Sequence, residues 1–359
     1  MKNLLKLQAK IFAITVILLI SISGILLAQN TIAIINAGST GSRLHVYKIK
    51  ADGKGIDIVY PTSSNEAASK GRALSSVADH VDSVKVFLNT MTSKYSGIEK
   101  NIPLYVLATA GMRLIKQEKT NPIYKKLNDQ KGKVFNNFCL DTAMTISGRY
   151  EGFYAWIAAN YKNGRLGFSI STPKKSLTYT GIPYGILEIG GASMQIAFAV
   201  NPPQSGSQSQ LYKDCISREG FSNIYSISYL GGGADQVYGE YKKQRKPKES
   251  KDLAGQAKEI FDKLGIDFKK IAYPYDSWQF LGLGTPIKFM PENMSSLVEA
   301  NDTDDMHPWM NAHYITWVTE SLKLKAPKPI QASDWTEGAA LDILINRKKP
   351  EGYNYNIKN

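Results

Sequence analysis

Two glycine-rich turns, each between apolar segments, carry residue types that could bind phosphate. Glycines let backbone amides approach phosphate oxygens closely, hydroxyls can donate hydrogen bonds, and an arginine adds positive charge. A single turn of this kind is equally typical of an ordinary hairpin. A second copy about 150 residues later favours two similar lobes that face one phosphate chain. The first turn reads Asn36-Ala37-Gly38-Ser39-Thr40-Gly41-Ser42-Arg43, and the second reads Gly190-Gly191-Ala192-Ser193.

These turns lie within a repeated order of expected elements. A helix is predicted at 77–91, where Val77, Val81, Val84 and Leu88 recur at helical spacing. The repeat is one of order rather than of close sequence identity, and it favours a duplicated ββ(β)α plan. The other expected elements are strands at 32–35, 43–49, 56–60, 103–108, 186–189, 195–200 and 224–230, and helices at 148–161 and 235–243.

Several common catalytic signatures are missing from the sequence. It contains no GxxxxGK[ST], no GxGxxG after a strand, no GxSxG and no HExxH. Its histidines, His45, His80, His307 and His313, lack metal-ligand spacing, which argues against a zinc site. What remains is a phosphate site built from backbone amides and hydroxyls.

Composition is that of a globular, basic protein. The 359 residues are enough for two domains, although one large domain is not excluded, and 43% of them are hydrophobic. The net charge of +13 favours attraction of polyanions in general. Basic runs at 242–251 and 347–349 contain no interleaved aromatic residues, so solvated loops are favoured over a nucleic-acid site.

The first 28 residues differ from the rest of the chain. Lys2, Lys6 and Lys10 precede an apolar run at 11–27 that ends at Ala28, which is typical of a cleavable secretory signal. An uncleaved membrane anchor is the alternative. We therefore expect a protein that is secreted or periplasmic, with membrane contact only through this segment. In an oxidising compartment Cys139 and Cys215 could form one disulfide.

Five segments, taken in order, resemble the apyrase family of nucleoside triphosphate diphosphohydrolases. A weaker sixth element is YLGGG (229–233). The resemblance spans nearly the whole chain after the signal. It implies the two-lobed α/β fold of actin, ribonuclease H-like and duplicated, with the active site in the interlobe cleft. The segments are INAGSTGSR (35–43), LATAGMRL (107–114), GRYEGFYAWIAANY (148–161), GILEIGGASMQIAF (185–198) and DWTEGAA (334–340).

The resemblance also divides the chain and assigns roles. It implies residues 1–28 as the signal, 29–147 plus 327–359 as lobe I, and 148–326 as lobe II. Glu151 matches the family's general base, and a carboxylate in the first turn of a helix is held ionised by the helix dipole. The alternative is that Glu151 only stabilises the helix start, with Gly148 as N-cap.

Three further residues match family positions around the reacting water. Ser193 and Gln195 match residues that orient it, and Thr109 matches a threonine near the water shell of the metal. Without the motif, Ser193 reads as a turn hydroxyl, Gln195 as an exposed strand position and Thr109 as a buried strand-end hydroxyl.

Two positions depart from the family pattern. Asn36 and Glu188 stand where the family usually has aspartates that hold waters on a divalent cation, expected here to be Mg²⁺ or Ca²⁺, or Mn²⁺. Asn36 can accept a hydrogen bond from such a water but brings no charge. Loss of one outer-shell carboxylate commonly costs about 10 to 100-fold in metal affinity or activity. This departure leaves three alternatives open. The protein is a slow enzyme, an enzyme with a changed cation requirement, or a nucleotide binder without turnover.

The nucleoside pocket is the least specific part of the sequence. Aromatic residues of the second lobe are candidates for stacking on a base, although such residues are more often core. We assign Trp156 and Trp335 to packing. The candidates for the base pocket are Gly231, Gly232, Trp278, His313 and Tyr314, with Trp317 beside them.

Together these features predict a monomeric, secreted or periplasmic apyrase of bacterial type. Its expected reaction is hydrolysis of the terminal phosphates of nucleoside tri- or diphosphates, by metal-assisted in-line attack of a water activated by Glu151. The expected partner is the nucleotide substrate, and nucleic acid is not expected. The alternatives are an exported nucleotide-binding or sensing protein, and a polyphosphate phosphatase of the same superfamily.

Overall fold

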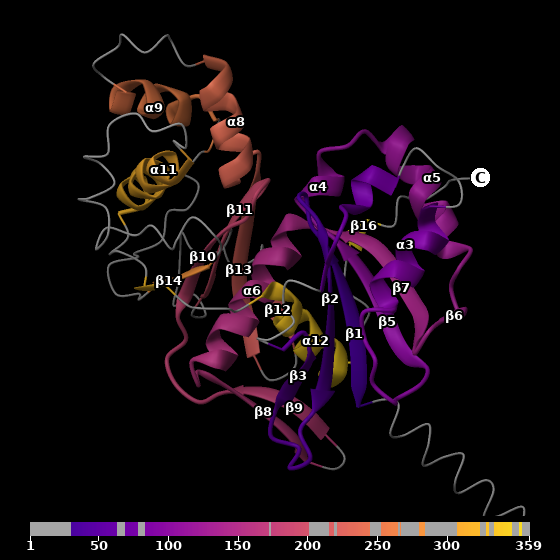
Figure 1. Cartoon of the computed structure of the whole chain (residues 1–359). Coiled ribbons are helices and arrows are strands. Elements are labelled where there is room, and N and C mark those ends of the chain that lie inside the picture. Colours follow the sequence, from indigo (N-terminus) through magenta and orange to yellow (C-terminus); the bar gives the residue numbers. More distant parts are fainter. Residues whose placement is uncertain are drawn as a thin grey trace, which may run out of the picture.

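The protein forms two α/β lobes that meet at two long helices (Figure 1). The expected signal at 1–28 lies outside the described residues. Among the described residues, no helix combines the length and hydropathy needed to cross a bilayer. The computed structural model describes residues 30–62, 69–77, 83–171, 174–200, 215–218, 221–244, 253–264, 266, 280–283, 307–323, 328–329, 334–346 and 352–353.

The first lobe is built on a sheet with the order β16-β7-β5-β1-β2-β3. β1 and β2 form the hairpin that contains the first glycine turn, and β5 runs parallel to β1. Their buried side chains are mostly β-branched or aromatic, which suits a pleated sheet covered by helices. The strands are β1 (Thr31–Ala37), β2 (Ser42–Ile49), β3 (Ile56–Tyr60), β5 (Ile102–Ala108), β7 (Phe138–Ile146) and β16 (Gly352–Tyr353), with β4 (Lys70–Gly71) paired to β2 and β6 (Val134–Phe135) to β7.

The second lobe repeats this plan with the order β12-β13-β11-β10-β14-β15. β10 and β11 form the hairpin of the second turn, β13 pairs antiparallel with β11, and β14 and β15 run parallel to β10. The expected duplication of order is thus confirmed. β15 belongs to this sheet, although the expected boundary at 327 placed it in lobe I. The strands are β10 (Gly185–Ile189), β11 (Ser193–Ala199), β12 (Ile216–Arg218), β13 (Phe221–Leu230), β14 (Phe280–Leu283) and β15 (Lys328–Pro329).

Further helices flank the sheets of both lobes (Figure 1). The helix expected at 77–91 is wrong at its start, because Val77 ends a 3₁₀ turn and its carbonyl accepts a hydrogen bond from the Ser83 hydroxyl. A separate hairpin joins β8 (Leu166–Ser171) to β9 (Lys174–Tyr179). The helical elements are η1 (Leu74–Val77), α3 (Ser83–Thr92), α4 (Ala110–Arg113) and α5 (Gln117–Asn128) in the first lobe, and α8 (Ala234–Gln244), α9 (Leu253–Asp262) and α11 (His307–Ser321) in the second.

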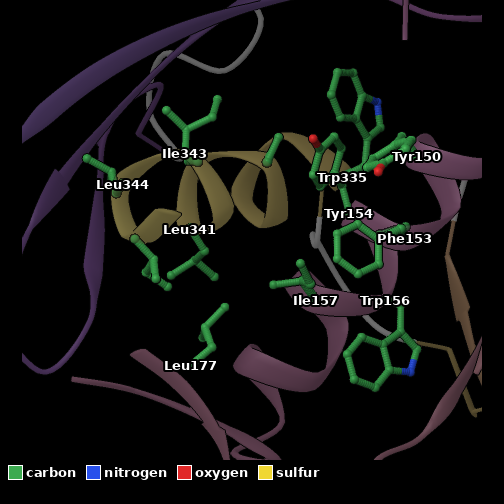
Figure 2. Close-up of a cluster of buried hydrophobic side chains, with 14 of the residues drawn as sticks. Tyr150, Phe153, Tyr154, Trp156, Ile157, Leu177, Trp335, Leu341, Ile343 and Leu344 are labelled. Atoms are coloured by element: carbon green, nitrogen blue, oxygen red, sulfur yellow. The ribbon is translucent and has the colours of Figure 1, made fainter. Parts of the chain in front are cut away.

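The lobes are joined by α6 (Gly148–Lys162) and α12 (Trp335–Asn346), which pack side by side (Figure 2). α6 follows β7 of the first sheet but packs on β10, β11 and β13 of the second. α12 follows β15 of the second sheet but contacts β1 and β2 of the first. Each helix therefore crosses to the opposite lobe.

This position explains why α6 is buried all round. Every residue from 150 to 160 is buried. A helix enclosed on all sides needs no polar stripe. Trp156 and Trp335 are both buried, as their assignment to packing requires.

The two helices touch through their backbones at Gly338. A Cβ added there would overlap the carbonyl group of Tyr154, lying 2.8 Å from its carbon, and would lie 3.0 Å from the Ala158 nitrogen. A glycine at this position therefore sets the distance between α6 and α12.

Replacing this glycine should separate the helices. We expect Gly338→Ala to lower the free energy of unfolding by about 1–3 kcal/mol, the usual range for overpacking, despite the helix propensity of alanine. Gly239 of α8 is the matched control, because nothing lies within 4 Å of a Cβ added there. Gly239→Ala should stabilise by about 0.4–1 kcal/mol. Urea unfolding measures both, and equal effects would contradict close packing at Gly338.

Candidate active site

The glycine turns of the two lobes meet. A Cβ added to Gly191 would lie 3.0 Å from Ser39 Oγ and would also overlap the Asp235 carboxylate. A Cβ added to Gly111, in the segment after β5, would lie 2.5 Å from Ser39 Cα. Three of the sequence motifs therefore converge on one place, and glycine is required wherever they approach most closely.

The second turn directs its carbonyl oxygens into the protein. Gly190 O accepts from Ala234 N at 2.9 Å, Gly191 O from Asp235 N at 3.0 Å, and Ala192 O from Gly231 N at 2.9 Å. The first residues of α8 and Gly231, in the turn that precedes this helix, thus bind the oxygens that would repel an anion. A turn with its carbonyls bound in this way is suited to presenting amides to phosphate.

The first turn is more open. Thr40 and Arg43 are exposed, Gly38, Ser39 and Gly41 are partly buried, and Ser42 is buried. Ser42 Oγ has no hydrogen-bond partner among the described residues. These placements are compatible with phosphate binding by the turn, which stays a prediction.

Glu151 lies in the first turn of α6, as expected, but the cap of this helix differs. Ser147 rather than Gly148 is the N-cap, because its extended backbone lets Oγ accept from Tyr150 N at 3.2 Å. Gly148 has no side chain that could do so. Glu151 is only 7% exposed. Its carboxylate therefore lies inside the protein rather than on a helix end in solvent.

Arg113, at the end of α4, holds this carboxylate. Its Nη2 donates to Glu151 Oε2 at 2.6 Å and to Ser193 Oγ at 3.0 Å, while Nη1 donates to the Ile146 carbonyl at 3.0 Å. One guanidinium from the first lobe thereby binds a strand end, the expected base and the second glycine turn. No role is predicted for Arg113 from the sequence alone. Its only signal was its place in ATAGMR, directly after the strand that leads to the site.

Gln195 completes the group around Glu151. Its Nε2 lies 3.1 Å from Glu151 Oε2, 2.6 Å from Ser193 Oγ and 3.2 Å from Ser228 Oγ. Gln195 is 1% exposed, so the alternative of an exposed strand position is wrong. The structure thus brings Glu151, Ser193 and Gln195 into direct contact.

Thr109 lies at the junction of the first two motifs. Its backbone N donates to the Ala37 carbonyl at 3.3 Å, which joins the ends of β5 and β1. Its buried side chain makes no cap hydrogen bond to α4. This placement, directly after β5, is compatible with the alternative of a buried strand-end hydroxyl, and the role of Thr109 near a metal's water shell stays a prediction.

Asn36 and Glu188 occupy equivalent positions near the ends of β1 and β10. Asn36 Nδ2 donates to the Asp334 carboxylate at 3.3 and 3.4 Å. Glu188 Oε2 is buried and, among the described residues, has no hydrogen-bond partner. Gln195 is paired with Glu188 across strands β10 and β11. Its Oε1 is also buried and has no hydrogen-bond partner among the described residues. A buried carboxylate oxygen without a donor is a group that a hydrated cation would satisfy.

Burial raises two pKa values at the site. Burial raises the pKa of Glu188 well above 4.5, and the charges of Glu151 and Asp334 raise it further. Burial also raises the pKa of Glu151, while Arg113 opposes the shift. The helix dipole alone therefore does not set the ionisation of Glu151, contrary to our expectation, because desolvation is the larger effect.

These observations fit a divalent cation held through water. In the part of the chain that the structure describes, no three His, Cys, Asp or Glu side chains are grouped closely enough to ligate a metal directly. Oxygens of Asn36, Glu188 and Gln195 nonetheless lie near the two turns. Hard cations such as Mg²⁺ commonly keep several waters and contact few protein groups.

The residues that the sequence suggested for a base pocket differ in their placement. Tyr314 is buried, its hydroxyl donates to Gly232 O at 2.7 Å, and its ring stacks on Trp317 at 6.0 Å. Its ring therefore packs in the core, the alternative that the sequence left open. His313 is half-buried, and this burial lowers the pKa of its imidazole. Gly231 adopts the left-handed backbone conformation that favours glycine. Trp278 lies outside the described residues.

The two cysteines are not joined. Cys139 lies in β7 of the first lobe and Cys215 precedes β12 of the second, and they form no disulfide in the structure. The sequence had left this pairing open.

The raised pKa of Glu188 gives a stability prediction for the cation-free protein. The folded chain binds this proton more tightly than the unfolded chain, so the contribution of Glu188 is greatest at acid pH and is lost as pH rises above about 4.5. Glu188→Gln should therefore raise the melting temperature at pH 8 by at least about 2 °C, and by less at pH 5. Glu320→Gln, on the exposed side of α11, is the control. Thermal unfolding in EDTA measures both, and destabilisation by Glu188→Gln at pH 8 would contradict this account.

Comparison with known proteins agrees with the geometry. The chain is 31% identical over 213 residues to ectonucleoside triphosphate diphosphohydrolase 1 of Bos taurus, covering 57% of this chain and 41% of the relative. It is 32% identical over 226 residues to nucleoside-triphosphatase ntp-1 of Caenorhabditis elegans, covering 58% and 39%. The chain therefore spans about two fifths of the length of these relatives.

A solved structure extends the similarity to the whole fold. An exopolyphosphatase from Cytophaga hutchinsonii matches with a TM-score of 0.51 and 12% identity, over 90% of this chain and 100% of that one. The fold is accordingly the two-lobed actin-like α/β fold that the sequence predicted. The model of the GDA1/CD39 (nucleoside phosphatase) family matches residues 29–303. The chain belongs to the GDA1/CD39 (nucleoside phosphatase) family.

Proposed function

We propose that this protein hydrolyses the terminal phosphates of nucleoside tri- and diphosphates, as an apyrase. One observation supports this most strongly: Glu151, Ser193 and Gln195 contact one another beside the place where the glycine turns of both lobes meet. The site thus combines a buried carboxylate, two polar groups that can hold a water, and two phosphate-binding turns. The names of the relatives point to the same reaction class.

The reaction is an in-line displacement by water. Gln195 and Ser193 hold the water against Glu151, whose carboxylate accepts its proton as the oxygen attacks the terminal phosphorus. The bond from that phosphorus to the bridging oxygen breaks, which releases inorganic phosphate and leaves a di- or monophosphate. Amides of the Gly38–Gly41 and Gly190–Ser193 turns stabilise the charge on the phosphate oxygens.

Arg113 prepares the base for this role. A protonated Glu151 could not accept a proton, and burial favours the protonated form. The guanidinium opposes that effect and fixes the carboxylate beside Ser193.

A divalent cation, when bound, neutralises charge on the phosphates. Asn36, Glu188 and the hydroxyl of Thr109 would hold this cation through water. Mg²⁺, Ca²⁺ and Mn²⁺ are the ions to compare. We further propose that the protein acts outside the cytoplasm, in the periplasm or as a secreted enzyme, since the N-terminal segment is typical of an export signal.

Two other functions are alternatives to nucleotide hydrolysis. Because Asn36 brings no charge to the cation site, the protein could bind nucleotide without turnover. A polyphosphate phosphatase would use the same turns. Phosphate release from ATP, ADP and polyphosphate with each cation, together with nucleotide binding, separates these functions.

The role of Glu151 has a direct test. Glu151→Gln and Glu151→Ala should lower the rate of phosphate release about 10²–10⁴-fold, the usual contribution of a general base, while nucleotide binding is retained. Glu118→Gln is the matched control, because Glu118 lies in the first turn of α5 and is exposed. If Glu151→Gln behaved like this control, with a small loss of stability and full activity, Glu151 would serve only the helix start.

The pH profile tests Arg113. Without its charge, the pKa of Glu151 should rise further, so the acid limb of the phosphate-release profile should move to higher pH in Arg113→Gln. Arg113→Lys keeps the charge and should move the limb less. A profile for Arg113→Gln that coincides with the wild type would show that the guanidinium does not control the base.

A further inference from the structure

Asp334 lies directly beside the position where this chain lacks a carboxylate. It precedes α12 and, through Oδ1, accepts from Thr336 N at 2.9 Å and from Thr336 Oγ1 at 3.0 Å. Its Oδ2 lies 3.3 Å from Asn36 Nδ2 and 3.4 Å from His45 Nε2. Asp334 is therefore fixed at a helix start and in contact with Asn36.

This contact orients the amide of Asn36. A carboxylate can only accept, so it binds the amide nitrogen and turns the amide oxygen away from itself. Asn36 Oδ1 accordingly faces the first glycine turn, 4.0 Å from where a Cβ of Gly38 would lie. An oxygen facing the turn can accept from a cation-bound water, whereas an amide nitrogen could not.

The charge of Asp334 reaches the rest of the site. It raises the pKa of both Glu151 and Glu188, after the larger effect of burial on each. The arrangement also follows the duplication of the fold. Glu188 on β10 lies near Glu151 at the start of α6, and Asn36 on β1 lies beside Asp334 at the start of α12.

We propose that Asp334 supplies, from the start of α12, the negative charge that Asn36 lacks, and that it positions the Asn36 amide oxygen toward the water shell of the cation. Asp334 is thus a positioning residue, and the first-lobe half of the cation site is the pair Asn36–Asp334. The inference rests on the proposed function for the presence of a cation, and it specifies which residues tune its affinity.

A charge swap tests the inference. Mn²⁺ binding is measured by electron paramagnetic resonance, with the metal alone and with the non-hydrolysable analogue AMPPNP, in the full-length protein. Asp334→Asn removes the charge but leaves a good N-cap, so folding should be retained. We expect a loss of Mn²⁺ affinity of about 10 to 100-fold. Adding Asn36→Asp to this variant moves the carboxylate to β1 and should restore the affinity to within about 3-fold of the wild type, an order-of-magnitude expectation from the same effect.

Glu337→Gln is the matched control. Glu337 is a buried carboxylate in the first turn of the same helix, paired with Lys162 at 3.1 Å. Its removal should leave Mn²⁺ affinity unchanged. Unchanged affinity in Asp334→Asn would show that Asp334 only caps α12, and a swap that folds but does not recover binding would show that the charge is not interchangeable. Absence of Mn²⁺ binding by the wild type would also overturn the inference.

The outcomes separate this inference from the proposed function. Phosphate release from ATP by the wild type, with Mn²⁺ binding unaffected by Asp334→Asn, would leave the hydrolase in place and reject only the role of Asp334. Absence of phosphate release, with the swap behaving as expected, would reject the hydrolase and retain the cation site.

Discussion

The backbone contact between α6 and α12 is the constraint on which the site depends. Gly338 brings these helices together so closely that no Cβ fits between them. Because each helix starts at the end of one sheet and packs on the other, their first turns lie between the lobes. Glu151 enters the site from one start and Asp334 from the other. A change in the distance between the helices would displace both carboxylates at once.

The second determinant is the balance of charge in a buried place. Three carboxylates, those of Glu151, Glu188 and Asp334, influence one another, and Arg113 is the cation that contacts the expected base. Such a group is costly to bury without compensation. Glu188 Oε2 is buried without a hydrogen-bond partner among the described residues. The described residues alone therefore do not fully compensate the buried negative charge. A site with an excess of negative charge beside phosphate-binding turns is consistent with a cation that binds together with an anionic substrate.

Much of the fold and part of the candidate site could be predicted from the sequence. Apolar runs bounded by glycines placed the hairpins of β1–β2 and β10–β11 correctly, because strand periodicity and turn chemistry are local properties. The family motifs brought Glu151, Ser193 and Gln195 into one hypothesis, and the structure places them in contact. Arg113 and Asp334 were not assigned, because their partners lie 38 and 298 residues away and the contacts depend on how the lobes meet. Ser147 was missed as the N-cap because Gly148 was taken as the helix boundary.

The central claim is that both glycine turns bind the same phosphate chain beside Glu151. A crystal structure with a non-hydrolysable nucleoside triphosphate and a divalent cation tests it most directly. The account predicts phosphate oxygens within hydrogen-bond distance of amides in both turns, and a water between Glu151 and the terminal phosphorus. A nucleotide bound by one turn only, or a Glu151 carboxylate directed away from the phosphates, would contradict it.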